Sequence, residues 1–347
     1  MVEVRGFGFN PGALRMLAYV PQGCPTGAPL VVVLHGCTQR AGAHAAAAGW
    51  LTLADRLGFV VVAPEQESQN NPNRCFNWFE TGDITRGAGE AASIHAMVQH
   101  MMRTHDVDPA RVFVTGLSAG GAMAAVMLAT YPELFAAGAV IAGLPYGVAQ
   151  GMHEAFGAMH GGGSRSDREL VDLVTSAAPW PGRAPRLSVW HGGADQTVKP
   201  SNGVALARQW AGVHGLGQPD EVEERAGRVR SVWRGRDGEV LVEMNVVAGL
   251  GHGVPLATTG DDPLGVVAPF MLEANVSSSL EISRFWGIAS PATPDRGWNT
   301  APAEDPHQAG GRRAPVGEQV MASVAPHVPQ DIQQVIAKAL GAAGLMR

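Results

Sequence analysis

The chain has 347 residues, of which 46% are hydrophobic and 16% are charged, and its formal net charge is −6 at pH 7. This composition is typical of a globular protein, and an acidic balance without a local basic cluster argues against binding of nucleic acid. Three cysteines, Cys24, Cys37 and Cys75, are too few for a disulfide scaffold and lack the spacing of a zinc site, although one disulfide pair remains open.

Neither a membrane span nor a targeting segment is expected. The most apolar stretch, residues 120–149, is interrupted at Pro132 and Pro145, so it predicts buried helix, turn and strand. The N-terminus has no apolar segment behind a basic start, and no signal peptide is therefore expected in this chain. That favours the cytoplasm if Met1 is the native start, whereas a secreted chain that has been trimmed would begin in the same way.

Apolar runs alternate with amphipathic or alanine-rich stretches, which predicts βαβ units around a mostly parallel sheet with helices on both faces. The expected strands are 30–34, 59–63, 111–115, 137–142 and 187–190, and the expected helices are 43–57, 90–105 and 120–130. Pro64 is expected to halt the second strand. A hairpin over 229–247, closed by Asp237-Gly238, is expected to supply the last core strand with its second arm.

The later part of the chain predicts an insertion and a tail. Residues 143–185 lie between two expected strands and are rich in Gly, Ser and Met, with one helical stretch near 167–177, which suits a small lid. With a closing helix over 280–288, the catalytic domain is expected to span 1–290. The remaining 291–347 form a Pro/Ala/Gly-rich tail with a short amphipathic helix over 331–345.

Ser118 lies in Gly116-Leu-Ser-Ala-Gly120, a match to the G-x-S-x-G pattern, between the strand 111–115 and a helix of small residues. In the α/β-hydrolase fold this context holds a nucleophilic serine on a strained turn, with its Oγ above the sheet. A five-residue match alone also occurs in ordinary glycine-rich turns. The strand and helix around it predict an α/β-hydrolase fold with Ser118 as nucleophile.

A serine nucleophile needs a base that is oriented by a carboxylate, and in this fold the chain order is serine, acid, histidine. Asp195 follows the strand 187–190, and His252 follows the last core strand between glycines. These two residues are therefore the predicted acid and base. Asp172, inside the expected lid helix, is a weaker candidate for the acid, and His191 is expected to be structural.

The tetrahedral oxyanion also needs hydrogen-bond donors. One is expected from the backbone N–H of Ala119, directly after the nucleophile. The other is expected from the loop that follows the strand 30–34, with the N–H of Cys37 as first choice and that of Thr38 as second. This chemistry requires neither a metal nor an organic cofactor, and none is expected.

With these residues assembled, the chain resembles the polyhydroxybutyrate depolymerase family of esterases, whose relatives include feruloyl and acetylxylan esterases. The resemblance runs from about residue 5 to about residue 290. It is carried by Leu34-His-Gly-Cys-Thr-Gln39, Asn73-Arg-Cys-Phe-Asn-Trp-Phe79, Arg86-Gly-Ala-Gly-Glu90, Gly116-Leu-Ser-Ala-Gly-Gly-Ala-Met123, Gly143-Leu-Pro-Tyr146, residues 191–198 and Gly251-His252.

The resemblance implies that Ser118, Asp195 and His252 form a catalytic triad. The implied activity is hydrolysis of poly- or oligo-3-hydroxybutyrate through an acyl-enzyme. The alternative enzymes are a feruloyl or acetylxylan esterase and a broad carboxylesterase for small esters. A non-enzymatic alternative is a granule- or protein-binding module that uses the C-terminal helix.

The resemblance also bears on the walls of the site. It implies that Cys37 lies at the oxyanion hole and that Trp78 helps to form the substrate cleft, together with His35 and Thr38. The ordinary alternative for Trp78 is a core aromatic residue. A Cys37–Cys75 disulfide would join the two loops that carry these residues.

Overall fold

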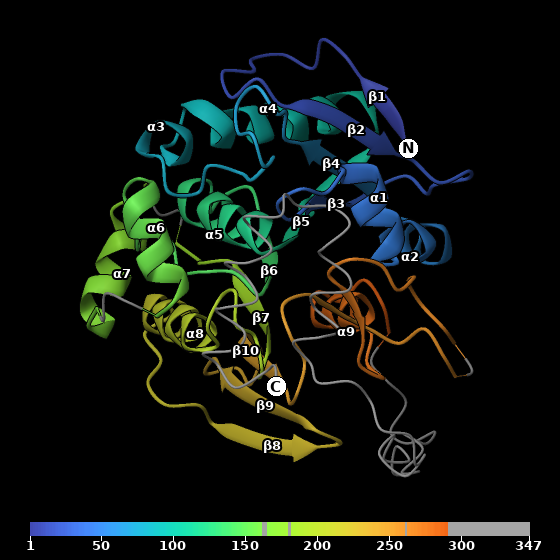
Figure 1. The fold of residues 1–347 in the computed structure, drawn as a ribbon. Helices are drawn as coiled ribbons and strands as arrows, with labels where there is room; N and C mark the ends of the chain where they lie inside the picture. Colours follow the sequence, from blue (N-terminus) through green and yellow to red (C-terminus); the bar gives the residue numbers. More distant parts are fainter. Residues whose placement is uncertain (162–164, 180–181, 261, 291–347) are drawn as a thin grey trace, which may run out of the picture. The chain divides into compact units, whose positions relative to one another are not determined.

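The structure is a computed structural model that describes residues 1–161, 165–179, 182–260 and 262–290 (Figure 1). These residues belong to the first of the two units into which the chain divides, Met1–Arg296. The tail expected over 291–347, with its amphipathic helix over 331–345, lies outside the described residues.

A ten-stranded sheet forms the centre of the described part, in the order β1-β2-β4-β3-β5-β6-β7-β10-β9-β8. Its strands are β1 (Val2–Val4), β2 (Arg15–Tyr19), β3 (Ala28–Leu34), β4 (Val60–Glu65), β5 (Val107–Leu117), β6 (Ala137–Ile141), β7 (Arg186–Gly192), β8 (Glu221–Arg225), β9 (Arg228–Arg234) and β10 (Val240–Val247). From β4 to β10 in this order the neighbours pair in parallel, and antiparallel strands close both sides. The prediction that the second arm of the hairpin supplies the last core strand is confirmed by the parallel pairing of β10 with β7.

Helices cover both faces of the sheet (Figure 1). They are α1 (Ala41–Ala47), α2 (Trp50–Leu57), α3 (Thr81–Ile84), α4 (Gly89–Thr104), α5 (Ala119–Thr130), α6 (Met152–Met159), α7 (Asp167–Thr175), α8 (Ser201–Val213) and α9 (Ser278–Phe285). Buried side chains of α4, α5 and α8 form one core, and those of α2 and α9 form a second core on the other face. In the described part of the chain, no helix is long and apolar enough to cross a membrane.

Strand β3 explains why the sequence produces two cores. All seven of its residues are buried. Leu30 and Val32 point into the core of α4 and α5, whereas Val31 and Val33 point into the core of α2 and α9. Successive side chains of a strand alternate between its faces, so a continuous apolar run requires cover on both sides. The core strands predicted from such runs therefore lie where the parallel sheet needs them.

Two local expectations are wrong. The single helix expected over 43–57 is divided into α1 and α2 at Gly49, whose φ is 85° and whose Cα packs against Leu264, so that a side chain would not fit. Strand β4 continues through Pro64 instead of stopping before it. Its pairing with β3 ends at Val62, and Pro64 faces only the antiparallel strand β2, where a missing N–H is tolerated.

The insertion between β6 and β7 contains α6 and α7, and it is bound closely to the body of the protein. Ser166 and Glu169 form a capping box at the start of α7. Gln209 of α8 is fully buried and donates from Nε2 to the carbonyls of Tyr146 (3.0 Å) and Leu170 (2.9 Å). These bonds tie the first part of the insertion and its helix α7 to α8. Its role as a lid stays a prediction.

Candidate active site

Ser118 occupies the turn between β5 and α5, with φ 56° and ψ −117°. A positive φ is unfavourable for a residue other than glycine. Two hydrogen bonds hold it: the Ser118 N–H donates to the carbonyl of Ile141 (2.9 Å), and the Ala122 N–H donates to the carbonyl of Ser118 (2.8 Å). A side chain at Gly116 would overlap the carbonyl of Gly120, and one at Gly120 would overlap the carbonyls at the end of β3. The turn therefore has the strand–turn–helix geometry expected around a nucleophilic serine.

Asp195 and His252 are hydrogen-bonded to each other. His252 Nδ1 donates to Asp195 Oδ2 over 2.7 Å, and Asp195 Oδ1 accepts the backbone N–H groups of Thr197 (2.8 Å) and Val198 (2.9 Å). The Asp195 side chain is fully buried. Burial alone would raise the pKa of Asp195, but hydrogen bonds from the His191 and His252 imidazoles outweigh it and hold this pKa well below its usual value.

The sheet explains why residues so distant in sequence share one edge. Strands β5, β7 and β10 run parallel, and Ser118, Asp195 and His252 each follow the C-terminal end of one of them. This edge of a parallel sheet is where α/β proteins place their functional groups. The chain order predicted for serine, acid and base is the order in which these strands present them.

His191, expected to be structural, lies directly beneath the acid. Its Nε2 donates to the carbonyl of Val198 (2.8 Å) and is 3.5 Å from Asp195 Oδ2. Val198 thus accepts from His191 with its carbonyl and donates to Asp195 with its N–H. His191 therefore braces the turn that holds the carboxylate. Sequence reasoning missed this contact, although its spacing from Asp195 along the chain was a usable signal.

The loop after β3 is fixed by covalent and hydrogen bonds. Cys37 and Cys75 form a disulfide with their Cα atoms 4.2 Å apart, which joins the two loops that the resemblance paired. The Thr38 N–H donates to the carbonyl of Asn73 over 2.7 Å, and Thr38 Oγ1 donates to the carbonyl of Cys37 (2.6 Å). The N–H of Thr38 is thereby used within the fold, so Cys37 remains the better candidate for the oxyanion donor of this loop.

His35, expected to contact substrate, is fully buried instead. Its Nε2 accepts the backbone N–H of Gln66 (3.1 Å), and Nδ1 lies 2.8 Å from the carbonyl of Gly36, to which it donates in the matching tautomer. Both ring nitrogens are used, and burial lowers the pKa of His35. The expectation of substrate contact is therefore corrected: His35 connects the loop after β3 to the end of β4.

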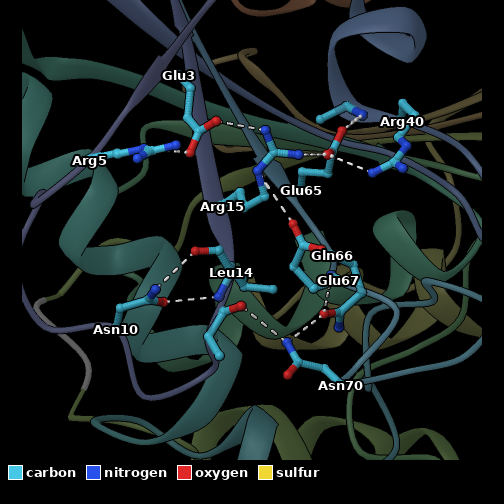
Figure 2. Close-up of polar contacts among 12 residues, drawn as sticks. Glu3, Arg5, Asn10, Leu14, Arg15, Arg40, Glu65, Gln66, Glu67 and Asn70 are labelled. Atoms are coloured by element: carbon cyan, nitrogen blue, oxygen red, sulfur yellow. Dashed lines mark hydrogen bonds and ion pairs between the residues drawn. The ribbon is translucent and has the colours of Figure 1, made fainter.

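A carboxylate at the end of β4 holds the other end of this loop. Glu65 Oε2 accepts the N–H of Ala41 at the start of α1 (2.9 Å), and Oε1 accepts from Arg15 (2.7 Å) and Arg40 (3.2 Å). Figure 2 shows Arg15 between Glu65 and Glu3, which it contacts at 2.7 Å. The first strands of the chain are thus linked to the loop that carries the candidate oxyanion donor.

An apolar cluster borders Ser118 on the side of α6. It contains Trp78, Phe79, Ala119 and Leu144, and α6 adds small alanine side chains. Trp78 is only 6% exposed and packs edge-on against Phe79, with ring centroids 5.4 Å apart. Trp78 therefore lies beside the strained turn of Ser118, called the elbow below, but largely inside the cluster. Its part in substrate binding stays a prediction.

An aromatic residue that sequence reasoning missed lies beside the base. The ring of Phe270 contacts that of His252 edge-on, with centroids 6.1 Å apart, and Phe270 is 39% exposed. No pattern in the sequence connects the two residues, because Phe270 precedes β12 (Met271–Glu273), which pairs with β11 (Val254–Leu256) outside the main sheet.

Comparisons with known proteins agree with this geometry. The sequence model of the family described as Esterase PHB depolymerase matches residues 14–233. The chain is 45% identical over 291 residues to poly(3-hydroxyalkanoate) depolymerase C of Paucimonas lemoignei, covering 83% of this chain and 70% of that protein. It is 32% identical over 266 residues to acetylxylan esterase A of Emericella nidulans, covering 73% of this chain and 85% of that protein.

A solved structure supports the same relationship. The acetyl xylan esterase from Aspergillus awamori superimposes with a TM-score of 0.71 and 25% identity, over 83% of this chain and 99% of that one. The α/β-hydrolase fold predicted from the sequence is confirmed, as is the prediction that the chain is a carboxylic ester hydrolase. The chain belongs to the PHB depolymerase family of esterases.

Proposed function

We propose that this chain hydrolyses ester bonds of 3-hydroxyalkanoate polymers or oligomers, with Ser118 as nucleophile, His252 as base and Asp195 as the carboxylate that orients it. The observation that carries the proposal is the 2.7 Å hydrogen bond from His252 to buried Asp195, on the sheet edge where Ser118 occupies its strained turn. The substrate class rests on the similarity to depolymerase C.

The reaction follows from this arrangement. His252 takes the proton of the Ser118 hydroxyl as its oxygen attacks the ester carbonyl, and Asp195 stabilises the imidazolium that forms. The backbone N–H groups of Cys37 and Ala119 hold the developing oxyanion. His252 then protonates the leaving alcohol, and a water molecule, activated in the same way, hydrolyses the acyl-enzyme and restores Ser118.

The surroundings of Ser118 suit this chemistry. The disulfide and the hydrogen bonds of Glu65 keep the Cys37 loop in one position, so the oxyanion donor requires little rearrangement during the reaction. The apolar cluster around Trp78 offers a dry wall for the alkyl part of an acyl group.

Replacement of Ser118 tests the nucleophile. Ser118→Ala is expected to lower kcat for a p-nitrophenyl ester by about 10⁶-fold, and a fluorophosphonate probe should label the wild type at Ser118 and leave this variant unlabelled. Ser176→Ala, at an exposed serine after α7, is the matched control and should keep full activity. Substantial turnover by Ser118→Ala would refute the assignment.

The substrate class needs a separate comparison, because the same triad serves many esters. Acetylated xylan is the second candidate, favoured by the similarity to acetylxylan esterases in sequence and structure. The values of kcat/KM for 3-hydroxybutyrate oligomers, acetylated xylan and feruloyl esters are measured side by side. The oligomers are expected to give the highest value, and a higher value for acetylated xylan would assign the chain to that substrate.

A further inference from the structure

Phe270 is a bulky residue in a backbone conformation that usually belongs to glycine. Its φ is 65°, which is an outlier for a large side chain. Pro269 precedes it, and the N–H of Met271 donates to the carbonyl of Ala268 over 2.9 Å. Residues 268–271 therefore form a type II turn with Phe270 at its third position, where glycine or asparagine is usual. Backbone strain of this kind is concentrated at active sites and ligand clamps, so it points to a functional role for this side chain.

The turn is attached to the segment that carries the base. The N–H of Val254, two residues after His252, donates to the carbonyl of Phe270 over 2.8 Å. A side chain at Gly253 would overlap that carbonyl. The Phe270 ring contacts the His252 ring edge-on, with centroids 6.1 Å apart, and Phe270 is 39% exposed. The strained turn therefore holds a partly exposed apolar ring next to the base.

The same turn also contacts the loop of the candidate oxyanion donor. Gln39 Nε2 donates to the carbonyl of Pro269 over 3.4 Å. Gln39 Oε1 accepts the N–H of Gly36, the residue before Cys37, over 2.8 Å. The turn is thus linked to the base on one side and to the oxyanion loop on the other. Phe270 therefore lies at the edge of the site where the ester must bind.

The role of the base determines which part of the ester meets this ring. His252 Nδ1 is occupied by Asp195, so Nε2 is the nitrogen that must reach the oxygen of the leaving alcohol to protonate it. The alcohol part of the ester is therefore bound beside the imidazole. The apolar cluster around Trp78 instead includes Ala119, the residue after the nucleophile. An aromatic ring beside the imidazole offers apolar surface to the alcohol part.

We propose that Phe270 is a specificity-determining residue that binds the apolar part of the leaving alcohol. In a 3-hydroxyalkanoate polymer the leaving alcohol is the hydroxyl end of the remaining chain, so the ring contacts the alkyl group of the first unit on that side. The polymer as substrate and His252 as the acid rest on the proposed function.

Simple esters that differ in one part only test this assignment. The value of kcat/KM is measured for methyl butyrate and hexyl butyrate, which differ in the alcohol, and for methyl octanoate, which differs from methyl butyrate in the acyl group. The wild type is expected to favour hexyl over methyl butyrate, and Phe270→Gly should reduce this ratio by about tenfold. The ratio of methyl octanoate to methyl butyrate should change by less than about twofold. Glycine suits the third position of a type II turn, so the turn itself is kept.

A second variant and a control keep the test sharp. Phe270→Asn serves should Phe270→Gly fail to fold, because asparagine also adopts a positive φ, and the same change of ratio is expected. Phe9→Gly, at a phenylalanine between β1 and β2 that is 65% exposed, is the matched control and should leave both ratios unchanged. The rate of labelling by a fluorophosphonate, whose leaving group is fluoride, should match that of the wild type in every variant.

Two outcomes would overturn the proposal: an unchanged ratio of hexyl to methyl butyrate in the Phe270 variants, or an equal loss on all three esters together with slower labelling. The second outcome would mean that Phe270 only positions His252. Because these esters contain no hydroxyalkanoate, a preference of the wild type for acetylated xylan over the oligomers would refute the proposed substrate without changing either ratio.

Discussion

Replacing Asp195 with asparagine changes one atom of the proposed triad and keeps the side-chain volume. Asp195 Oδ1 accepts two backbone N–H groups, from Thr197 and Val198, and Oδ2 accepts from His252 Nδ1. The amide oxygen of an asparagine is needed by the two backbone donors, so its NH₂ group would face His252 Nδ1. Two donors would then oppose each other. His252 must change its tautomer or turn away, and in either case it loses the orientation of a base toward Ser118.

The expected loss in kcat is about 10⁴-fold, which corresponds to about 5.5 kcal/mol of transition-state stabilisation. It is measured with p-nitrophenyl butyrate, on protein whose unfolding transition matches that of the wild type. Asp172→Asn is the matched control, because Asp172 is an exposed aspartate of α7 whose ion pair with Arg168 spans 3.8 Å, and kcat should hardly change. Retention of more than about a tenth of the wild-type kcat by Asp195→Asn would refute the reasoning.

Three further changes test the surroundings of the site. Replacing Cys37 and Cys75 with serine should lower the unfolding free energy by about 4 kcal/mol in urea denaturation, since the disulfide links residues 38 positions apart; a loss below about 1 kcal/mol would contradict this. Burial raises the pKa of Glu90 from 4.5 to about 8, so the folded state keeps a proton that the unfolded state releases. As the pH rises from 4.5 to about 8, the unfolding free energy should therefore fall by up to about 1.4 kcal/mol per pH unit. Glu90→Gln should abolish this slope. His191→Leu should lower kcat/KM by about tenfold or more and move the acid limb of its pH profile upward, because Asp195 loses a nearby N–H; His191→Gln should restore part of both.

The parts of the site that follow from local signals could be predicted from the sequence. The small residues around Ser118 and the β5–α5 context identify the elbow. Asp195 and His252 could be found because each follows a recognisable apolar strand, and a parallel sheet brings such strand ends to one edge.

The remaining features depend on contacts between distant segments. Gly49 is tolerated in a helical pattern, but here it adopts a left-handed conformation that separates α1 from α2, and Leu264, from far along the chain, leaves no room for a side chain at this position. His35 was expected to face substrate, but the N–H of Gln66 on the loop after β4 turns it inward. Pairing of β1 and β2 with the sheet edge also could not be foreseen, because both strands are short, β1 is mostly exposed and β2 is buried on one face only.

Crowding around the elbow limits which positions near Ser118 can be substituted when this enzyme is redesigned. Substitutions at Gly116 and Gly120 would collide with backbone atoms, which no change of rotamer can relieve. Leu144 and Val198 instead belong to the apolar cluster that includes Ala119, the residue after Ser118, and α6 adds alanines there. A mutational library aimed at a new acyl group should therefore vary this wall and leave the elbow as it is.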